Sequence, residues 1–261
     1  MTKLQQIVIG ACFLLFLVLF FGFGTKSNEQ KQLEMSRVQS FETLGVDNLL
    51  KDAKESLPSE KIDLIHFFEK EIQDAENDSI KIELLKRLSG EWYELKEYAL
   101  SGHYASQIAE IIDQEDAWSI AGTTFAIGIK NYQDQKKKDY CTDKAIQSFE
   151  NALSVNPNNL QHRVNMALCY TENPPKDNPM QGIVMLLDLN KKHPDNIPVM
   201  QQLARLAIQT GQFEKAILRL NKILSLDENN KKAICMLVDA HAGAGNQENA
   251  RLFEEKCLNY N

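Results

Sequence analysis

Histidine and cysteine are the residue types in this sequence whose chemistry could serve catalysis or metal binding. The five histidines are scattered and form no H-E-x-x-H pair, so a metalloprotease-type zinc site is not indicated. The five cysteines include no C-x-x-C pair, which argues against a zinc site or a thioredoxin-like motif. Cys141, Cys169, Cys235 and Cys257 are expected to be small buried hydrophobic residues, with one disulfide left open. Unpaired thiols would slightly favour a reducing compartment.

Other catalytic patterns fail as well. The stretch from Gly122 to Lys130 departs from the G-x-x-x-x-G-K spacing of a phosphate loop and lies within a helical pattern. No G-x-S-x-G occurs, and the acidic residues lie on solvated helix faces without a distinct pair. We therefore predict that the protein is not an enzyme and uses no cofactor and no metal. A haem- or metal-binding protein that uses cysteine and histidine is the alternative of another class.

The charge balance bears on the partner. The 261 residues carry a net charge of −7, and the sequence pI is about 5.4. Binding to nucleic acid requires clustered lysine and arginine, so no nucleic-acid partner is expected. The one basic run, Lys136 to Lys138, is flanked by Asp134 and Asp139 and indicates a solvated loop.

The elements that would position a binding site are amphipathic helices, most clearly between Ile197 and Asn230. Apolar residues recur there at the spacing of one helix face, first from Met200 to Ala207 and then from Ala216 to Leu224. Gly211 separates the two helices, where a left-handed residue is needed. The pattern recurs 34 residues later, because Leu237, Gly245 and Ala250 follow Leu203, Gly211 and Ala216.

This pair resembles a tetratricopeptide repeat (TPR), a helix-turn-helix unit of about 34 residues. Trp118, Gly122, Phe125, Ala145, Phe149 and Pro157 resemble the same motif in an earlier unit. The resemblance implies an all-α, right-handed TPR-type solenoid of four to five units, preceded by a single transmembrane helix and a helical cap. The expected domains are an anchor at 1–24, a polar stalk at 25–45, a cap at 46–81 and a solenoid at 82–261. Its units lie near 82–114, 115–159, 160–196, 197–230 and 231–257. In the first, Lys96 stands where the turn glycine is expected.

In TPR proteins the first helices of successive units line a groove that holds a peptide or a helix. The resemblance therefore gives these groove candidates: Ser119, Thr123, Asn165, Leu168, Gln201, Arg205, Gln209 and Asp239, with Cys235 beside the last. Two units are longer than the repeat, by an insertion of 11 residues around Asn131–Tyr140 and by a proline-rich turn at Asn173–Pro179. We expect both to be loops at one edge of the solenoid, where insertions often mark a binding face. The edge candidates are Lys136, Lys137, Lys138, Pro174, Pro175, Lys176 and Pro179.

Residues Ile7 to Gly24 form an apolar run without charge. As a helix it would span roughly 27 Å, close to the hydrocarbon core of a bilayer, and we predict a single-pass anchor. Lipidation of Cys12 and cleavage after Gly24 are the less favoured alternatives. Short N-terminal anchors commonly export the rest of their chain, so an extracytoplasmic (periplasmic) solenoid is expected. The count of flanking lysines and arginines weakly opposes this orientation.

The predicted function is that of a membrane-anchored TPR scaffold, which binds another protein or peptide during assembly or maintenance of a bacterial envelope complex. An anchor followed by a TPR array is similar to the TPR subunits of cytochrome c maturation and of the secretion translocon. A subunit that holds apocytochrome c, or a translocon-associated subunit, is therefore the alternative.

Overall fold

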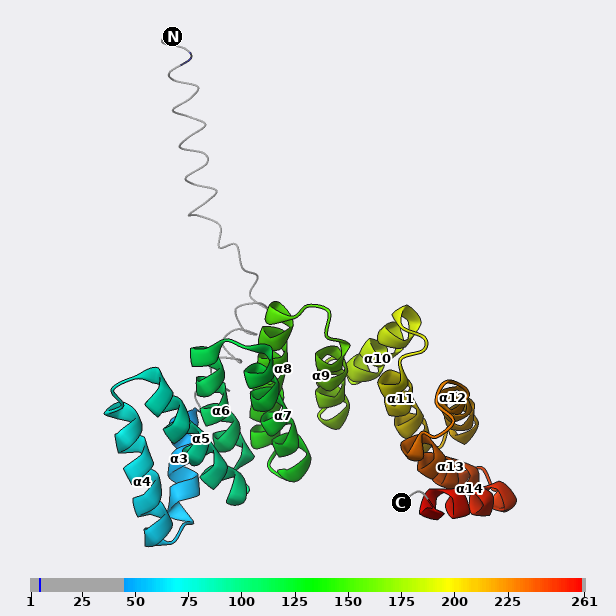
Figure 1. Cartoon of the computed structure of the whole chain (residues 1–261), viewed down its shortest axis with the longest axis horizontal. Coiled ribbons are helices and arrows are strands. Elements are labelled where there is room, and N and C mark those ends of the chain that lie inside the picture. The colour runs from blue at the N-terminus through cyan, green and yellow to red at the C-terminus, as the bar shows by residue number, and fades with distance from the viewer. Residues whose placement is uncertain (1–4, 6–44, 260–261) are drawn as a thin grey trace. The chain divides into compact units, whose positions relative to one another are not determined.

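The computed structural model describes Gln5 and residues 45–259 of the chain. The chain divides into two compact units, residues 1–49 and residues 50–261. Helix α3 begins in the first unit and continues into the second, which holds the eleven helices from α4 to α14. In the second unit the helices follow one another as antiparallel hairpins, each packed mainly against its neighbours along the chain (Figure 1).

Residues 45–259 contain twelve helices and no strand. They are α3 (Val46–Glu55), α4 (Ser59–Gln73), α5 (Asp78–Glu94), α6 (Tyr98–Ile112), α7 (Glu115–Asn131), α8 (Gln135–Val155), α9 (Leu160–Glu172), α10 (Gln181–Lys192), α11 (Ile197–Gln209), α12 (Phe213–Leu226), α13 (Lys231–Gly243) and α14 (Gln247–Asn259).

Asparagine starts the first helix of most hairpins. Helices α5, α9, α11 and α13 each follow an asparagine whose side chain accepts a hydrogen bond from a backbone N–H in the first turn. In the same order, these asparagines are Asn77, Asn159, Asn196 and Asn230. Such a cap satisfies one of the donors that a helix leaves unpaired at its start, and contributes about 1 kcal/mol. The repeated asparagine therefore marks the start of four of these hairpins.

A left-handed residue closes three of the hairpins. Gly211 and Gly245 have φ of 71° and 79°, and Lys96 has φ of 63°. In each turn the residue that follows donates its N–H back across the helix end: Glu97 to Trp92, Gln212 to Ala207 and Asn246 to His241. Lys96 thus occupies the turn position that glycine occupies in the other two units.

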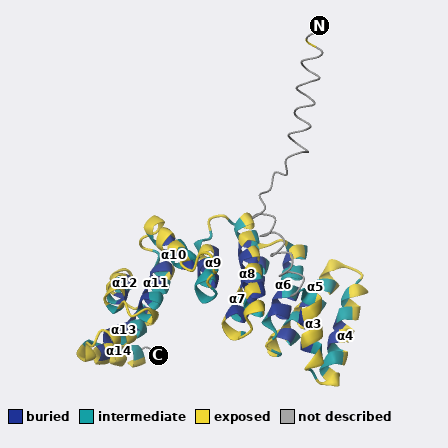
Figure 2. Ribbon diagram, turned by 180° about the vertical axis from the view of Figure 1, so that it is seen from behind, coloured by how far each residue is buried: buried dark blue, intermediate teal, exposed yellow. Residues whose placement is uncertain are grey.

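Small residues allow the helices of a unit to cross closely. A methyl group on Gly122 would lie 2.7 Å from the ring of Phe149, and one on Gly182 would collide with the backbone of α9. Buried residues line the faces along which neighbouring helices meet (Figure 2). Two of the buried clusters share α11, because Val199 and Leu203 pack toward α9 and α10 while Met200 and Ala204 pack toward α12 and α13.

The prediction of a transmembrane helix before the solenoid is wrong for this fold. No helix within the described ranges is both long and apolar enough to cross a membrane. The longest of them, α8 with 21 residues, cannot cross one because it has lysines in its first turn and further charges along its exposed face. The same finding corrects the prediction of a single-pass membrane protein. The apolar run at residues 7–24 lies outside the described residues.

The long insertion between the helices of the second unit is helix rather than loop. α7 extends to Asn131 and α8 starts at Gln135, where Asp134 caps it by accepting from the N–H of Lys137 at 2.8 Å. Lys136, Lys137 and Lys138 therefore lie in the first turn of α8. The segment with Pro174, Pro175, Lys176 and Pro179 does form a connection without helix, between α9 and α10.

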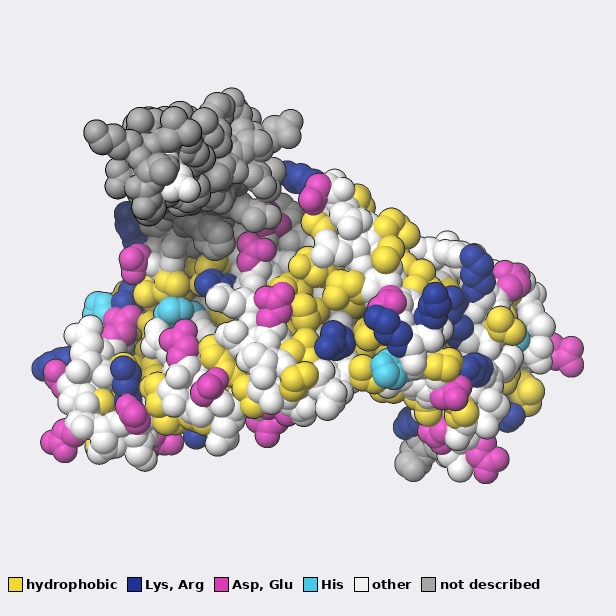
Figure 3. All heavy atoms as spheres, turned by 90° about the horizontal axis from the view of Figure 1, so that it is seen from above, with side chains coloured by type: hydrophobic (Ala, Val, Ile, Leu, Met, Phe, Trp, Pro, Cys, Tyr) yellow, Lys and Arg dark blue, Asp and Glu magenta, His cyan; other side chains and the backbone are white. Residues whose placement is uncertain are grey.

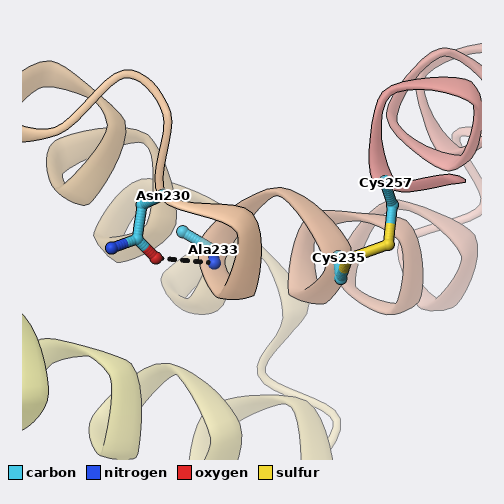
Figure 4. The surroundings of a disulfide bond; sticks show 4 residues. All are labelled: Asn230, Ala233, Cys235 and Cys257. Carbon is cyan, nitrogen blue, oxygen red and sulfur yellow. Dashed lines mark hydrogen bonds between the residues drawn. A yellow bond between two sulfur atoms is a disulfide. The ribbon is translucent and has the colours of Figure 1, made fainter. Parts of the chain in front are cut away.

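Two cysteines expected to be buried thiols are paired instead. Cys235 of α13 and Cys257 of α14 form a disulfide with a Cα–Cα distance of 5.0 Å, which closes the last hairpin (Figure 4). Cys141 and Cys169 are buried free thiols, as expected. Disulfides persist in oxidising compartments, so this pairing reverses the weak preference for a reducing one.

Candidate functional site

The first cavity lies between α7 and α9, with α8 behind it. It has a volume of about 180 Å³. Its wall on α7 includes Thr123 and Ile127, its wall on α9 includes Asn165 and Leu168, and Phe149 of α8 is its floor. The walls are mostly apolar with a few polar atoms at the rim, which is the usual make-up of a binding pocket.

A second cavity lies on the other side of α7. It measures about 460 Å³ and is bounded by α5 and α7, with α6 as its floor. Tyr93 of α5 and Ile120 of α7 stand at its rim, and Ala105 and Ile108 of α6 lie at its base. Ile120 is 61 % exposed although it is aliphatic. We call the two cavities and the exposed ridge of α7 between them the α7 groove.

A three-residue charge network borders the first cavity. The Glu172 carboxylate at the end of α9 lies 3.7 Å from Lys130 Nζ and 3.3 Å from an Arg205 guanidinium nitrogen. Lys130 and Arg205 thus share the Glu172 carboxylate. A second carboxylate could bind between the two cations, and both would then remain paired. The second cavity has Lys86 and Asp116 in its lining.

The structure brings some of the predicted groove residues together and separates others. Thr123, Asn165 and Leu168 line the first cavity, and Arg205 reaches its edge through Glu172. Gln201 instead donates to the Asn230 side chain at 2.9 Å and so belongs to the junction between two units. Ser119, Gln209, Asp239 and Cys235 line neither cavity.

Sequence reasoning missed several residues of the α7 groove. Lys130 and Glu172 lie at helix ends, beyond the positions that repeat spacing identifies. Ile120 and Ile127 have an apolar character that favours assignment to the core. The available signal was an isoleucine two residues after Trp118, off the apolar face that Trp118, Ala121 and Phe125 form.

The start of α8 and the proline-rich connection after α9 meet at one edge. Asn173, the first residue after α9, donates to Asp139 Oδ1 and to Thr142 Oγ1 at 2.9 Å each, and accepts from Gln135 Nε2 at 2.8 Å. The start of α8 is tied to the preceding unit as well: Lys137 Nζ lies 3.3 Å from Glu97 and 5.1 Å from the centre of the Tyr132 ring. The edge is therefore held by side chains from three successive units.

The free thiols are poor nucleophiles. Burial raises the pKa of Cys141 well above its ordinary value, and burial raises the pKa of Cys169 to about 12. At neutral pH both remain protonated, and the thiolate is the reactive form. In the part of the chain that the structure describes, no group of three or more His, Cys, Asp or Glu is placed to hold a metal ion. The absence of a cofactor and of catalysis stays a prediction.

The helix pair α11–α12 with its following turn is the segment that comparison with known families identifies. Residues 197–230 match the tetratricopeptide repeat family. The described chain is accordingly an all-α, TPR-like solenoid. No curated protein matches the sequence.

Solved structures of TPR proteins are similar to this chain at low identity. One MamA protein structure aligns with a TM-score of 0.42 at 12 % identity and covers 68 % of this chain and 90 % of that chain. Another MamA structure aligns at 0.43 and 13 %, with 66 % and 92 % covered. YrrB, described as a TPR protein with an unusual peptide-binding site, aligns at 0.39 and 14 %, with 73 % and 90 % covered.

Proposed function

We propose that this protein is a TPR-type scaffold that binds a segment of another protein in the α7 groove. The observation that carries the proposal is the pair of cavities on either side of α7, which together offer apolar walls from α5 to α9. An exposed aliphatic residue between two cavities is costly in water, and a bound apolar side chain would cover it.

The lining residues define the chemistry of the bound segment. Apolar side chains spaced across α7 would enter the two cavities, and the amide of Asn165 is placed to bond to a peptide backbone. A carboxylate on the segment would bind between Lys130 and Arg205, which now share Glu172. The segment is thus apolar at two positions and acidic at the end that faces α11.

We infer that the edge formed by Asn173 and the start of α8 contributes to the choice of partner. The stretch from Pro174 to Pro179 is largely exposed, and proline restricts its backbone. A restricted loop loses little conformational entropy when it binds. Shortening this loop would then weaken capture of the partner without abolishing it.

Site-specific crosslinking tests the groove. A photo-crosslinking residue at Thr123 in the full chain, irradiated in its native cells, should capture one discrete segment of a partner, while the same residue at Val155 of α8 should not. The captured segment is then synthesised, and its affinity is measured by calorimetry.

The matched variants are Ile120→Glu and Val155→Glu, which change similarly exposed aliphatic residues on different helices. We expect Ile120→Glu to weaken binding at least tenfold, about 1.4 kcal/mol, and Val155→Glu to leave it unchanged. If both variants bound the segment with equal affinity, the segment would bind elsewhere, and the α7 groove would be rejected as its binding site.

A further inference from the structure

The outer face of α12 carries a basic stripe with apolar residues in it. Lys215, Leu218, Arg219, Lys222 and Leu226 follow the spacing of one helix face, opposite the buried Ala216, Leu220 and Ile223. Leu218 is 75 % exposed, the highest exposure among the large apolar residues described. We call these five residues the basic stripe.

The cations of this stripe contact mainly neutral groups of their own chain. Lys215 Nζ donates to the amide oxygen of Gln212 at 2.7 Å, and the Arg219 guanidinium donates to the backbone oxygen of Lys215 at 3.4 Å. Lys222 donates to the Pro194 carbonyl at 2.8 Å and pairs with exposed Asp195 at 2.9 Å. Partial burial lowers the pKa of Arg219, because its guanidinium loses hydration. A carboxylate from a partner beside Arg219 would compensate for that loss.

Helix α4 carries the opposite pattern on its outer face. Glu60, Asp63, Phe67, Glu71 and Asp74 are all exposed and share one side, away from the buried Ile65 and Phe68. Phe67 is 54 % exposed at the middle of this row. Residues 59–78 hold seven acidic and two basic side chains, a net charge of −5, whereas residues 181–226 hold six basic and three acidic, a net charge of +3. We call the α4 residues the acidic stripe.

The two stripes belong to different ends of the second unit. α4 packs on α5, and α12 packs on α11 and α13, so the stripes do not meet within one chain. Residues 1–45 are a poor match for the basic stripe because they hold four basic and three acidic residues. We propose that this protein self-associates, with the acidic stripe of one copy packed against the basic stripe of a second copy.

The contact has the composition of a protein interface. Phe67 would pack against Leu218 at the centre, and oppositely charged residues would surround the pair, as in an interface with an apolar core and a polar rim. Charge complementarity of this kind speeds association and selects the partner, and salt weakens it.

One helix pair buries less than the roughly 1,200 Å² of a stable interface, so additional surface is needed. α10 supplies it with Met180, Val184 and Leu187, which are exposed at one-face spacing. Lys and Arg side chains gather beside hydrophobic ones over the α10–α12 part of the molecule (Figure 3).

Charge reversal on each stripe tests the proposal with the full chain. The variants are Glu71→Lys with Asp74→Lys, and Lys215→Glu with Arg219→Glu. Both should keep the chain folded, because lysine suits the C-terminal end of α4, glutamate at 215 suits the first turn of α12, and Arg219 is not in the buried core. Glu254→Lys with Glu255→Lys on exposed positions of α14 is the matched control for the charge change.

Sedimentation velocity at about 100 µM, well above a micromolar dissociation constant, should show the wild type and the control associated at low salt. Each reversed variant alone should be monomeric. An equimolar mixture of the two reversed variants should form a complex, because the reversed stripes attract each other.

Several outcomes would overturn the proposal. A monomeric wild type at low salt would show that the stripes do not join two copies. The basic stripe of α12 would then bind an acidic protein other than this one. Association that survives both reversals, or a mixture of the variants that stays monomeric, would assign any self-association to other surfaces.

Discussion

The left-handed residues Lys96, Gly211 and Gly245 differ in how well they suit their backbone. An L-residue with a side chain is strained at positive φ by about 1 kcal/mol, whereas glycine is not. A methyl group at Gly211 would meet no neighbour within 4 Å, so only the backbone conformation matters there. We expect Gly211→Ala to lower the free energy of unfolding by about 1 kcal/mol and Lys96→Gly to raise it by about 0.5 kcal/mol.

Urea unfolding followed by circular dichroism measures both changes. Because the residues occupy equivalent turns, the effects must have opposite signs. A destabilised Lys96→Gly variant would contradict the strain at this turn.

Glu115 at the start of α7 stabilises the fold through its charge. Hydrogen bonds from Asn156 and Asn159, together with one from His162, lower the pKa of Glu115 to about 2. The three donor nitrogens lie 2.8, 2.5 and 2.8 Å from its carboxylate oxygens. A pKa lower in the folded than in the unfolded chain means that this stabilisation is complete above about pH 4.5 and is lost as the pH falls toward 2.

The thermal midpoint of Glu115→Gln should therefore lie below that of the wild type at pH 6, and the gap should narrow between pH 4.5 and 2.5. Glu110→Gln, an exposed change on α6, is the control and should show no such gap. A gap that is constant with pH would show that the Glu115 charge is not responsible.

For single residues, the sequence predicted backbone conformation better than it predicted side-chain contacts. The repeat spacing placed Lys96 at the turn position, and the structure gives it the left-handed conformation expected for glycine. Nothing in the spacing predicts the cluster around Glu115, because its three donors come from the next turn and helix, more than 40 residues along the chain. Side-chain pairs of that separation depend on how the units stack.

At the scale of helices, Gly182 allows α9 and α10 to meet. A methyl group there would lie against the Ala167 carbonyl oxygen and 2.8 Å from the Thr171 backbone nitrogen, and backbone atoms cannot move aside cheaply. We expect Gly182→Ala to lower the free energy of unfolding by about 2 kcal/mol. Gly90→Ala is the matched control. Gly90 lies inside α5 with open space around it, so alanine should raise that free energy by about 0.5 kcal/mol.

The disulfide stabilises the terminal helix. Ala250 is the one α14 residue that is buried among those described, and no further unit covers α14 within the described chain. The bond joins residues 22 positions apart, and closing a loop of that size contributes about 3 kcal/mol.

A reducing agent should lower the thermal midpoint of the wild type and leave that of Cys235→Ser unchanged. Alkylation of the unfolded, unreduced chain followed by peptide mass spectrometry should label Cys141 and Cys169 and leave Cys235 and Cys257 unlabelled. Labelled Cys235 and Cys257 would show that the bond is absent.

The excess residues between Phe125 and Ala145 show what the repeat spacing cannot predict. An excess over 34 residues predicts an insertion but not its conformation. Here Asp134 caps a helix and Lys136 to Lys138 continue it, so the excess lengthens α7 and α8. The proline-rich excess could be predicted better, because proline lacks the N–H that a helix interior requires.

For the whole molecule, the periodicity of apolar and small residues was enough to predict an all-α solenoid, because each unit contacts mainly its neighbours and its pattern is local. The candidate site was predicted only in part. Thr123, Asn165 and Leu168 lie at repeat positions and line one cavity. The second cavity depends on Tyr93, from a unit whose motif is degenerate, and on Ile120, which is not a motif position.

The position of α11 between two buried clusters has a consequence for how the solenoid opens. Leu203 belongs to the cluster with α9 and α10, and Met200 to the cluster with α12 and α13, so freeing the backbone of α11 requires both to separate. In a stacked array the ends open first, and local opening controls amide hydrogen exchange. Amides in the middle of α11 should therefore exchange more slowly than those of α14, and reduction of the disulfide should speed exchange in α14 well before it affects α11.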